Sequence, residues 1–483
     1  MKKHFTLSLA FLGAFVFGQF STPNSGQTYT IEDLDLLTEA ITYDAVNNKY
    51  ILTEDLTISA NDTFLAENDF TLAIENGKLI TIAGAIQVNA PNQVHFTSTN
   101  PGNLYFNGIR IQDGATANFT NFKMTYGGGI RVLGENFFMN QSEVSYQNAG
   151  VSTGAAINFS KGNPIIKNSR FVENITPVVA SGANQSVALT FEYNYVYHNN
   201  LENSNRPQIN MGSSGNGVTV IRGNQIIGDR NQTKVGGISV SSMLGVNNEF
   251  LIEDNLIQDN RYGITTTGGN TKGNILNNQI IDNNTEPIPL NGGSGINIYL
   301  TQNASTNVIN ILGNQIKGNL WGITSVGNGA YLNLGEAGNL GNNYFENNGN
   351  EGETYALYNN TPNPISALGN CWDPINTLTR AEQVIFHSVD NPILGTVDFS
   401  IIGCQSLGLA DVTGNKTKLY PNPNSGQFYI ETDFKQLYYI YDVTGKLVAS
   451  GELKTGKNNI KTSLKKGTYL LKTNTSTYKI VIK

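Results

Sequence analysis

A short asparagine-containing phrase recurs through the middle of the sequence and restricts the folds open to this chain. Each copy has an apolar residue, Asn three places later, a second apolar residue after two more, and Asn or Asp after a further three. The copies are Phe191-Asn194-Val196-Asn199, Ile221-Asn224-Ile226-Asp229, Ile252-Asn255-Ile257-Asn260, Ile275-Asn278-Ile280-Asn283, Ile311-Asn314-Ile316-Asn319 and Leu340-Asn343-Phe345-Asn348, with the variants Ile166-Ser169-Phe171-Asn174 and Ala367-Asn370-Trp372 at the two ends. The first polar positions are separated by 25, 30, 31, 23, 36, 29 and 27 residues. Fixed strands therefore alternate with loops of variable length, which is typical of a solenoid.

The residue types predict the kind of solenoid. Apolar residues with period two indicate short strands, and Asn and Gly between them accept the left-handed backbone of a tight corner. A second phrase follows the first in several repeats, as in Gly237-Ile238-Ser239-Val240, Gly263-Ile264-Thr265-Thr266, Gly295-Ile296-Asn297-Ile298 and Gly322-Ile323-Thr324. Two or three strands per coil, all parallel, predict an all-β fold, a parallel β-helix. Equivalent Asn side chains would then stack about 4.8 Å apart and hydrogen-bond from coil to coil.

Charge and cysteine content limit the partners and the compartment. Charged residues make up 14% of the chain, and the net charge is −7. Residues 412–483 hold 12 Lys against 4 acidic residues, a net of +8, which leaves −15 for residues 1–411. The acidic main part disfavours a nucleic-acid partner. We expect the two cysteines, Cys371 and Cys404, to form a disulfide that clamps the end of the solenoid, the alternative being two buried thiols.

The first 18 residues have the pattern of a secretory signal peptide. Lys2 and Lys3 precede an apolar core over residues 7–17, which is too short to span a bilayer. No later segment is long and apolar enough for a transmembrane helix. We therefore expect an exported protein without a transmembrane segment.

The rest of the chain divides by composition. Residues 19–49 are expected to cap the first coil with a short helix over residues 30–41, N-capped by Thr30. Residues 50–405 form the solenoid and its end cap, which includes a helix opening at the capping-box pattern Thr379-Arg380-Ala381-Glu382. Residues 406–418 are expected to be a linker, and residues 419–483 a small β-sandwich of short strands and Gly turns.

Residues 50–405 resemble the Asn-rich, right-handed parallel β-helix proteins of the pectate-lyase-like superfamily. The resemblance rests on the two phrases above and implies the fold. It does not imply one chemistry, because the superfamily holds lyases, hydrolases, epimerases, adhesins and non-catalytic members.

The C-terminal segment resembles a type A C-terminal sorting domain of the type IX secretion system. The matching residues, in family order, are Tyr420, Pro421, Asn422, Pro423, Gly426, Asp442, Gly445, Lys446, Gly467, Thr468, Tyr469 and the basic end at residues 478–483. The resemblance implies recognition by an outer-membrane translocon and release from, or attachment to, the outer surface of a Gram-negative bacterium. The alternative is an ordinary carbohydrate-binding or fibronectin-like module.

Stacking would turn sequence positions into surface columns, and these supply the candidate binding residues. The residue after Ile in the second phrase faces outward, which gives the column Arg110, Arg131, Asn158, Ser239, Thr265, Asn297 and Thr324. Arg110 and Arg131 could contact an acidic sugar, or could instead bind loop carbonyls. Tyr195 and Tyr197 could offer faces on which sugars stack. A second column, Lys167, Glu192, Arg222 and Glu253, is expected to fix the register by ion pairs between coils.

A third group lies at the end of the Asn phrase. Its members are Asp229, Arg230, Asp259, Arg261, Asp282 and His198. Carboxylates to hold calcium, with a base to remove a proton beside a uronate, are what a calcium-assisted polysaccharide lyase needs. Asp is also an ordinary corner residue, which is the alternative interpretation.

No sequence motif identifies a reaction. The chain contains no Gly-x-Ser-x-Gly elbow, His-Glu-x-x-His helix or phosphate loop. We expect a secreted or surface-attached β-helix that binds extracellular polysaccharide and needs no cofactor. One alternative is a polysaccharide lyase or hydrolase, with calcium in the case of a lyase, and another is a non-catalytic structural adhesin.

Overall fold

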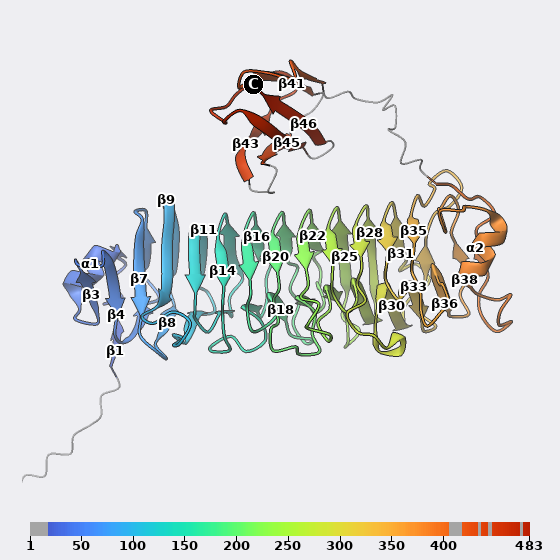
Figure 1. Cartoon of the computed structure of the whole chain (residues 1–483). Helices are drawn as coiled ribbons and strands as arrows, with labels where there is room; N and C mark the ends of the chain where they lie inside the picture. The colour runs from blue at the N-terminus through green and yellow to red at the C-terminus, as the bar shows by residue number, and fades with distance from the viewer. Residues whose placement is uncertain (1–17, 405–417, 433–435, 443–446, 474–476) are drawn as a thin grey trace, which may run out of the picture. The chain divides into compact units, whose positions relative to one another are not determined.

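The computed structural model describes residues 18–404, 418–432, 436–442, 447–473 and 477–483 (Figure 1). The expected signal peptide and linker lie outside these residues, except for Gly18 and Lys418 at their ends. The chain divides into two compact units at residue 405.

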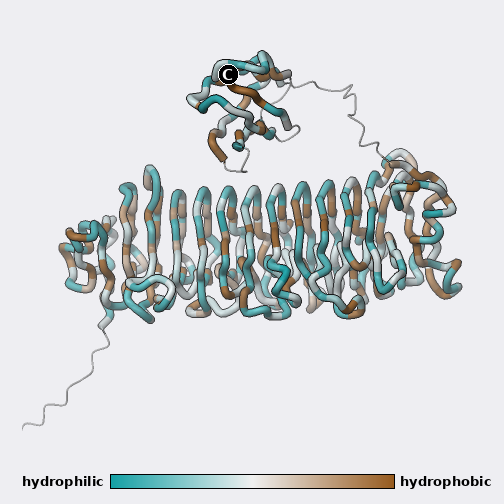
Figure 2. Tube along the Cα trace, viewed as in Figure 1, coloured by the Kyte–Doolittle hydropathy of each residue, from teal (hydrophilic) through white to brown (hydrophobic). Residues whose placement is uncertain are grey.

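The first unit is the predicted parallel β-helix (Figure 1). Each full coil places one strand in sheet A, one in sheet B and one in sheet C, as defined below. Hydrophobic residues recur at matching places from coil to coil (Figure 2). They point inward, and Ile221, Ile252, Ile275 and Ile311 are each 0% exposed. The Ile of the repeated phrase therefore builds a continuous apolar interior.

Sheet A contains 14 strands in parallel. They are β1 (Gln19–Ser21), β5 (Asp55–Ile58), β8 (Leu79–Ile82), β10 (Gly108–Ile111), β12 (Ile130–Val132), β15 (Ile157–Phe159), β18 (Val179–Ser181), β21 (Ile209–Met211), β24 (Ile238–Val240), β27 (Ile264–Gly269), β30 (Ser294–Gln302), β33 (Trp321–Val326), β36 (Leu357–Asn360) and β38 (Ile385–Phe386).

Sheet B follows sheet A along each coil. Its strands are β2 (Thr28–Tyr29), β6 (Thr63–Ala66), β9 (Ala85–Ser98), β11 (Thr116–Thr125), β13 (Asn136–Asn140), β16 (Ile165–Lys167), β19 (Thr190–Glu192), β22 (Thr219–Arg222), β25 (Asn248–Glu253), β28 (Thr271–Leu276), β31 (Ile309–Leu312), β34 (Leu332–Asn333), β37 (Ile365–Ser366) and β39 (Val397–Asp398).

Sheet C completes the coil. It shares the long strands β9 and β11 with sheet B. Its other strands are β3 (Ile41–Asp44), β4 (Lys49–Leu52), β7 (Phe70–Ile74), β14 (Glu143–Ser145), β17 (Arg170–Val172), β20 (Tyr195–Tyr197), β23 (Gln225–Ile227), β26 (Leu256–Gln258), β29 (Gln279–Ile281), β32 (Gln315–Lys317) and β35 (Tyr344–Glu346).

A ladder of buried side-chain amides runs along the corner between sheets B and C. The Asn255 Oδ1 accepts hydrogen bonds from the backbone N and from Nδ2 of Asn224, both at 2.9 Å. Its Nδ2 donates to the Ile221 carbonyl at 2.9 Å. Side-chain and backbone bonds of this kind link the equivalent residues of successive coils: Ser169, Asn194, Asn224, Asn255, Asn278, Asn314, Asn343 and Asn370. The first polar position of the phrase is therefore the stacking position, as predicted.

The residue before each ladder position adopts a left-handed backbone, and all of these residues are Asn, Asp or Gly except Tyr193, whose φ is 56°. Asp254, Asn277 and Asn342 have φ of 57°, 55° and 51°, and Gly223 and Gly313 have φ of 66° and 71°. This left-handed region favours Gly and tolerates Asn and Asp. The ladder and the left-handed residue before it together form the corner.

A second ladder follows the last position of the phrase, with one exception. Asn174, Asn199, Asn260, Asn283, Asn319 and Asn348 are its asparagines. Between Asn199 and Asn260 the linking side chain is Gln208, which accepts from the Asn199 backbone N at 3.3 Å and donates to the Asn260 Oδ1 at 2.9 Å. Asp229, which holds this place in the phrase, lies outside the ladder. An ionised carboxylate accepts hydrogen bonds but donates none, so it could not donate to the next side chain of the ladder.

The N-terminal end carries the predicted helix α1 (Ile31–Leu37), with the Thr30–Asp33 capping box. The helix ends before residue 41, where β3 begins and pairs antiparallel with β4. Ile31 and Leu34 are buried over the first coil. The strands β1 and β2 pair with β5 and β6, so the stack already begins within the segment 19–49 that the sequence assigned to a cap.

The other end carries helix α2 (Leu378–Val384), whose N-cap is Thr377. The expected N-cap at Thr379 is wrong, because Arg380 N bonds Thr377 Oγ1 at 3.1 Å. The chain leaves the helix and enters β38 at Ile385, so the helix does not extend to Val389, which is 70% exposed. Cys371 and Cys404 are joined by a disulfide, with their Cα atoms 4.4 Å apart.

The second unit has two antiparallel sheets, as expected for a small sandwich. One contains β40 (Lys418–Tyr420), β41 (Gln427–Thr432) and β44 (Gly456–Lys461). The other contains β42 (Gln436–Tyr441), β43 (Leu447–Leu453), β45 (Gly467–Thr473) and β46 (Thr477–Ile482). Phe428, Ile440, Leu453, Leu471 and Ile480 are among its core residues, each 0% exposed.

Substitution Asn278→Asp tests the ladder at nearly constant volume. The carboxylate cannot donate to the Ile252 carbonyl or the Asn314 Oδ1, which Asn278 Nδ2 reaches at 2.9 and 3.0 Å. We expect the free energy of unfolding to fall by about 2–4 kcal/mol, as for buried polar groups left unpaired, measured as a lower thermal and denaturant midpoint. The matched control is Asn118→Asp, at an exposed position of β11, which should change the midpoint little. Equal midpoints for the two variants would contradict the ladder's role.

Candidate functional site

The charged column of sheet B forms ion pairs between coils. Arg222 lies between Glu192 and Glu253, at 3.0 and 2.9 Å from their carboxylates. Lys167 is in register with Glu192, and its ammonium lies 5.5 Å from the centre of the Phe138 ring. Glu192, Arg222 and Glu253 are partly buried and ion-paired, so they join neighbouring coils, and Lys167 contacts the Phe138 ring of an adjacent coil.

The candidate lyase residues lie at corners between sheet C and sheet A. His198, Asp259 and Asp282 have φ of 52°, 58° and 54°. In the same column Gly318 and Asn347 have φ of 66° and 54°. The corner geometry alone therefore accounts for a short polar residue or Gly at these positions.

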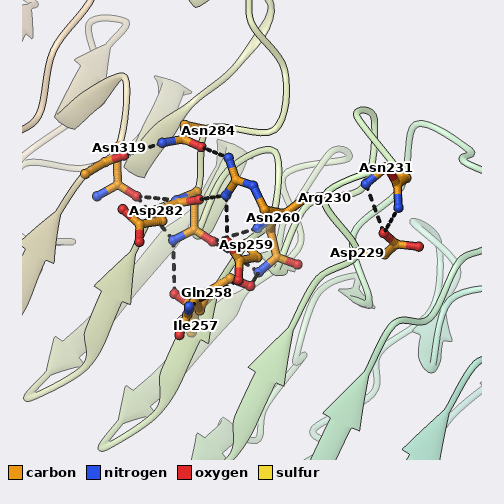
Figure 3. A network of polar contacts seen from close by, with 12 residues as sticks. Asp229, Arg230, Asn231, Ile257, Gln258, Asp259, Asn260, Asp282, Asn284 and Asn319 are labelled. Atoms are coloured by element: carbon orange, nitrogen blue, oxygen red, sulfur yellow. Dashed lines mark hydrogen bonds and ion pairs between the residues drawn. The ribbon is translucent and has the colours of Figure 1, made fainter.

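Arg230 ties part of this group together (Figure 3). Its Nη1 lies 2.6 Å from the Asp259 Oδ1, and its Nη2 donates to the Asn284 Oδ1 at 2.7 Å. Asp282 takes part through its backbone carbonyl, at 3.3 Å from Nη1. Asp229 instead accepts hydrogen bonds from Asn231, both at 2.9 Å. The structure thus brings Arg230 and Asp259 together and leaves the Asp229 carboxylate in a separate turn.

Arg261 and His198 are engaged elsewhere. The Arg261 guanidinium donates to the Asn205 side chain and to the Asn291 carbonyl. The His198 ring stacks on Tyr197, with the ring centres 3.7 Å apart. Among the residues that the structure describes, no group of three or more His, Cys, Asp and Glu side chains is placed to hold a metal ion. In this structure the contacts of Arg230 and Arg261 join neighbouring coils and loops.

The two arginines of the outward column of sheet A are neighbours. Arg110 and Arg131 pair in register on β10 and β12. The Arg131 Nη2 donates to the Ser160 Oγ at 3.0 Å, and burial lowers the pKa of its guanidinium. The column continues through Asn158 as predicted, and then through Ala180 and Asn210 before Ser239. The sequence analysis missed these two positions because their coils lack the Gly-Ile phrase.

Tyr195 and Tyr197 lie on a different sheet from the arginines. Both side chains project from β20 of sheet C, and their rings stack 5.7 Å apart. The Arg170 guanidinium covers the Tyr195 ring at 4.8 Å from its centre. The residues expected to bind substrate therefore form two separate patches rather than one site.

Among the described residues, a group of four aromatic side chains lies on the outside of the coils at the C-terminal end of sheet A, and the sequence did not predict it. It consists of Trp321, Tyr355, Tyr358 and Phe386, which we call the aromatic platform; all four side chains are partly exposed. Tyr358 and Phe386 occupy successive outward positions of β36 and β38, and their rings stack 4.6 Å apart. Trp321 stacks on Tyr355 at 5.4 Å and meets the Tyr358 ring edge-on at 5.1 Å.

The platform is held in place by hydrogen bonds and adjoins a polar network. The Trp321 Nε1 donates to the Pro289 carbonyl, in the 3-10 turn Pro289–Asn291, at 3.0 Å. In the adjoining coils Thr324 Oγ1 donates to the Asn297 Oδ1 at 2.8 Å, and Asn297 Nδ2 donates to the Thr265 Oγ1 at 2.9 Å. The result is a fixed apolar surface beside neutral hydrogen-bonding groups.

The platform could have been predicted only in part. Thr324 and Tyr358 are in register across β33 and β36, but the second phrase reads Ala356-Leu357-Tyr358 in that coil instead of Gly-Ile. Alignment of Leu357 with Ile323 would have placed Tyr358 in the outward column. The positions of Trp321 and Tyr355, at the entrances to their strands, depend on the loops between coils.

The predicted sorting-motif residues that the structure describes hold the second unit together. The Asn422 Oδ1 accepts from the Val481 backbone N at 2.8 Å, which fixes strand β46. Tyr469 Oη donates to the Lys465 carbonyl at 2.8 Å. Gly426 has φ of 93°. Gly445 and Lys446 fall outside the described residues.

Comparison with protein families identifies this second unit. Residues 418–483 match the family described as a secretion system C-terminal sorting domain. The tail marks the protein for export by the type IX secretion system, to the cell surface or the medium. Comparison with curated proteins gives no match. In the described part of the chain, no helix has the length and apolarity to cross a membrane.

Calcium addition tests the corner group. Because Arg230 already neutralises Asp259, we expect calcium to leave the thermal midpoint of the full chain unchanged. The Arg230 side chain is 54% exposed, so Arg230→Ala should lower the free energy of unfolding by at most about 1 kcal/mol. A midpoint that rises with calcium, and no longer does so in Asp259→Asn, would contradict this account.

Proposed function

We propose that the exported protein binds extracellular polysaccharide on the outward face of sheet A, with the aromatic platform as the principal contact. The observation that carries this proposal is the contiguous group of four partly exposed rings next to Asn297 and Thr324. Exposed apolar groups of this kind, rimmed by polar residues, mark interaction surfaces.

The chemistry of the surface suits a sugar polymer. A pyranose ring presents C–H groups on its faces and hydroxyl groups at its edge. Aromatic side chains can pack against the C–H faces of the sugar, and amide and hydroxyl side chains can hydrogen-bond its hydroxyl groups. A site needs both kinds of group to bind and orient such a ligand.

The architecture favours a long ligand. The coils repeat about every 4.8 Å, and the strands of sheet A continue in register along the stack, with partly exposed outward residues such as Asn210, Thr265 and Asn297. The contacts of Trp321 with Pro289 and Tyr355 order its side chain before any ligand arrives. Less conformational entropy is then lost on binding.

The alternatives have less support in the described residues. The corner group is internally paired, so no specific observation favours a lyase or hydrolase. An adhesin would use the same exposed rings to contact a protein. It would therefore lack affinity for glycans and still lose attachment when the platform is altered.

The test is binding of the full chain to a polysaccharide panel by affinity electrophoresis. Removal of a ring that stacks on a sugar should cost about 1.4 kcal/mol or more, so Trp321→Ala and Tyr358→Ala should each weaken binding at least about tenfold. Thermal midpoints would show that each variant is folded.

The matched control is Tyr195→Ala, which removes an aromatic ring from sheet C. It should leave the affinity unchanged. Wild-type affinity in both platform variants, or loss of binding in the control, would contradict the proposal.

A further inference from the structure

The outward face of sheet A carries no Asp, Glu, Lys, Arg or His in its central column from β15 to β38. The column reads Asn158, Ala180, Asn210, Ser239, Thr265, Asn297, Thr324, Tyr358 and Phe386. The neighbouring row on the last coils, Thr267, Tyr299, Val326 and Asn360, is also uncharged.

The other two sheets are different. Sheet B carries the Glu192–Arg222–Glu253 ion pairs, and sheet C carries Lys317–Glu346 at 3.1 Å. The absence of charge between β15 and β38 is therefore a property of that part of sheet A, and does not simply follow from a chain with few charges.

The charges that border the platform have the wrong sign for an acidic ligand. Glu353 lies two residues before Tyr355, and the Asp390 Oδ2 accepts from the backbone N of His387, the residue after Phe386, at 2.9 Å. Burial raises the pKa of Tyr355, and the charges of these two carboxylates raise it further. Arg261 is already bonded to Asn205 and Asn291. A uronate at the platform would thus meet the carboxylates of Glu353 and Asp390, while the two Nη donors of Arg261 are already engaged by neutral groups.

The cations of the same face are distant. Arg110 and Arg131 belong to β10 and β12, and β12 is seven strands from β33 in the sheet. At about 4.8 Å per strand the separation from the platform is about 34 Å. They cannot compensate for an acidic sugar bound there.

We infer that the platform takes an uncharged polysaccharide, built from neutral hexoses or pentoses, and discriminates against uronate polymers. This inference rests on the proposed function and names its ligand class. In the Thr265–Asn297–Thr324 network, Thr265 and Asn297 are partly exposed and present neutral hydrogen-bonding groups, which suit hydroxyl groups.

The experiment compares matched polymers on the full chain: glucan with glucuronan, mannan with mannuronan, and galactan with galacturonan. Affinity is measured at about 0.1 and about 1 M salt, where the Debye length is about 10 and 3 Å. We expect at least one neutral polymer to bind at least about tenfold more tightly than its uronate counterpart. Its affinity should change less than about twofold with salt, because no ion pair forms.

Variants assign the binding to the platform. Binding of the neutral polymer should be lost in Trp321→Ala and in Tyr358→Ala, and kept in Arg110→Ala and Arg131→Ala. Asn360→Lys adds a cation on β36, two residues from Tyr358, and should raise uronate affinity several-fold while the neutral polymer binds as before.

The outcomes separate the two claims. Tighter, salt-sensitive uronate binding that still requires Trp321 would overturn the inference and leave the proposed function standing. Binding of any polymer that does not depend on Trp321 or Tyr358, or no binding at all, would overturn both.

Discussion

The interaction on which the solenoid depends is the hydrogen bond between a buried side-chain amide and its equivalent one coil away. Asn is suited to it because one short side chain accepts and donates at the same time. In the first ladder Asn255, for example, satisfies a backbone N–H and a carbonyl of the preceding coil, and its Nδ2 also donates to the Asn278 Oδ1 in the next coil. Buried polar groups must be paired in this way, and here the pairing also sets the spacing of the coils.

The position of Gln208 shows how strict this requirement is. Where the phrase has Asp229, the ladder continues through an amide that comes from a different part of the coil. The longer side chain reaches from its own segment to Asn199 and Asn260. Asp229 lies in a surface turn, where it accepts hydrogen bonds from Asn231. It holds a ladder position in the repeated phrase but takes no part in the ladder.

The alignment of the coils also determines which side chains are neighbours on the surface. Once the coils are fixed, each outward sequence position becomes a column, and the columns differ in chemistry. Sheets B and C carry ion pairs between coils, whereas sheet A is uncharged in its central column from β15 to β38 and ends in aromatic rings. The sorting tail delivers this rod outside the cell, where an extended, uncharged surface can meet a polymer.

The sequence predicted what is periodic and missed what is not. The Asn and Ile positions repeat, so the fold and the Asn224–Asn255–Asn278 stack could be predicted from spacing alone. Trp321 and Tyr355 come together through loops whose lengths vary, and no spacing rule places them. The Asp and Arg residues at the corners are ambiguous in the sequence for the opposite reason, because the same residue types serve backbone geometry and metal binding.

Amide hydrogen exchange of the full chain tests the central claim most directly. If the ladders hold the coils in register, the backbone amides of Asn224, Asn255, Asn278 and Asn314, which donate to side-chain carbonyls, should exchange only with global unfolding. The loop amides over residues 243–247 should exchange much faster. Ladder amides that exchange as rapidly as that loop would show that the side-chain ladder does not hold the coils together.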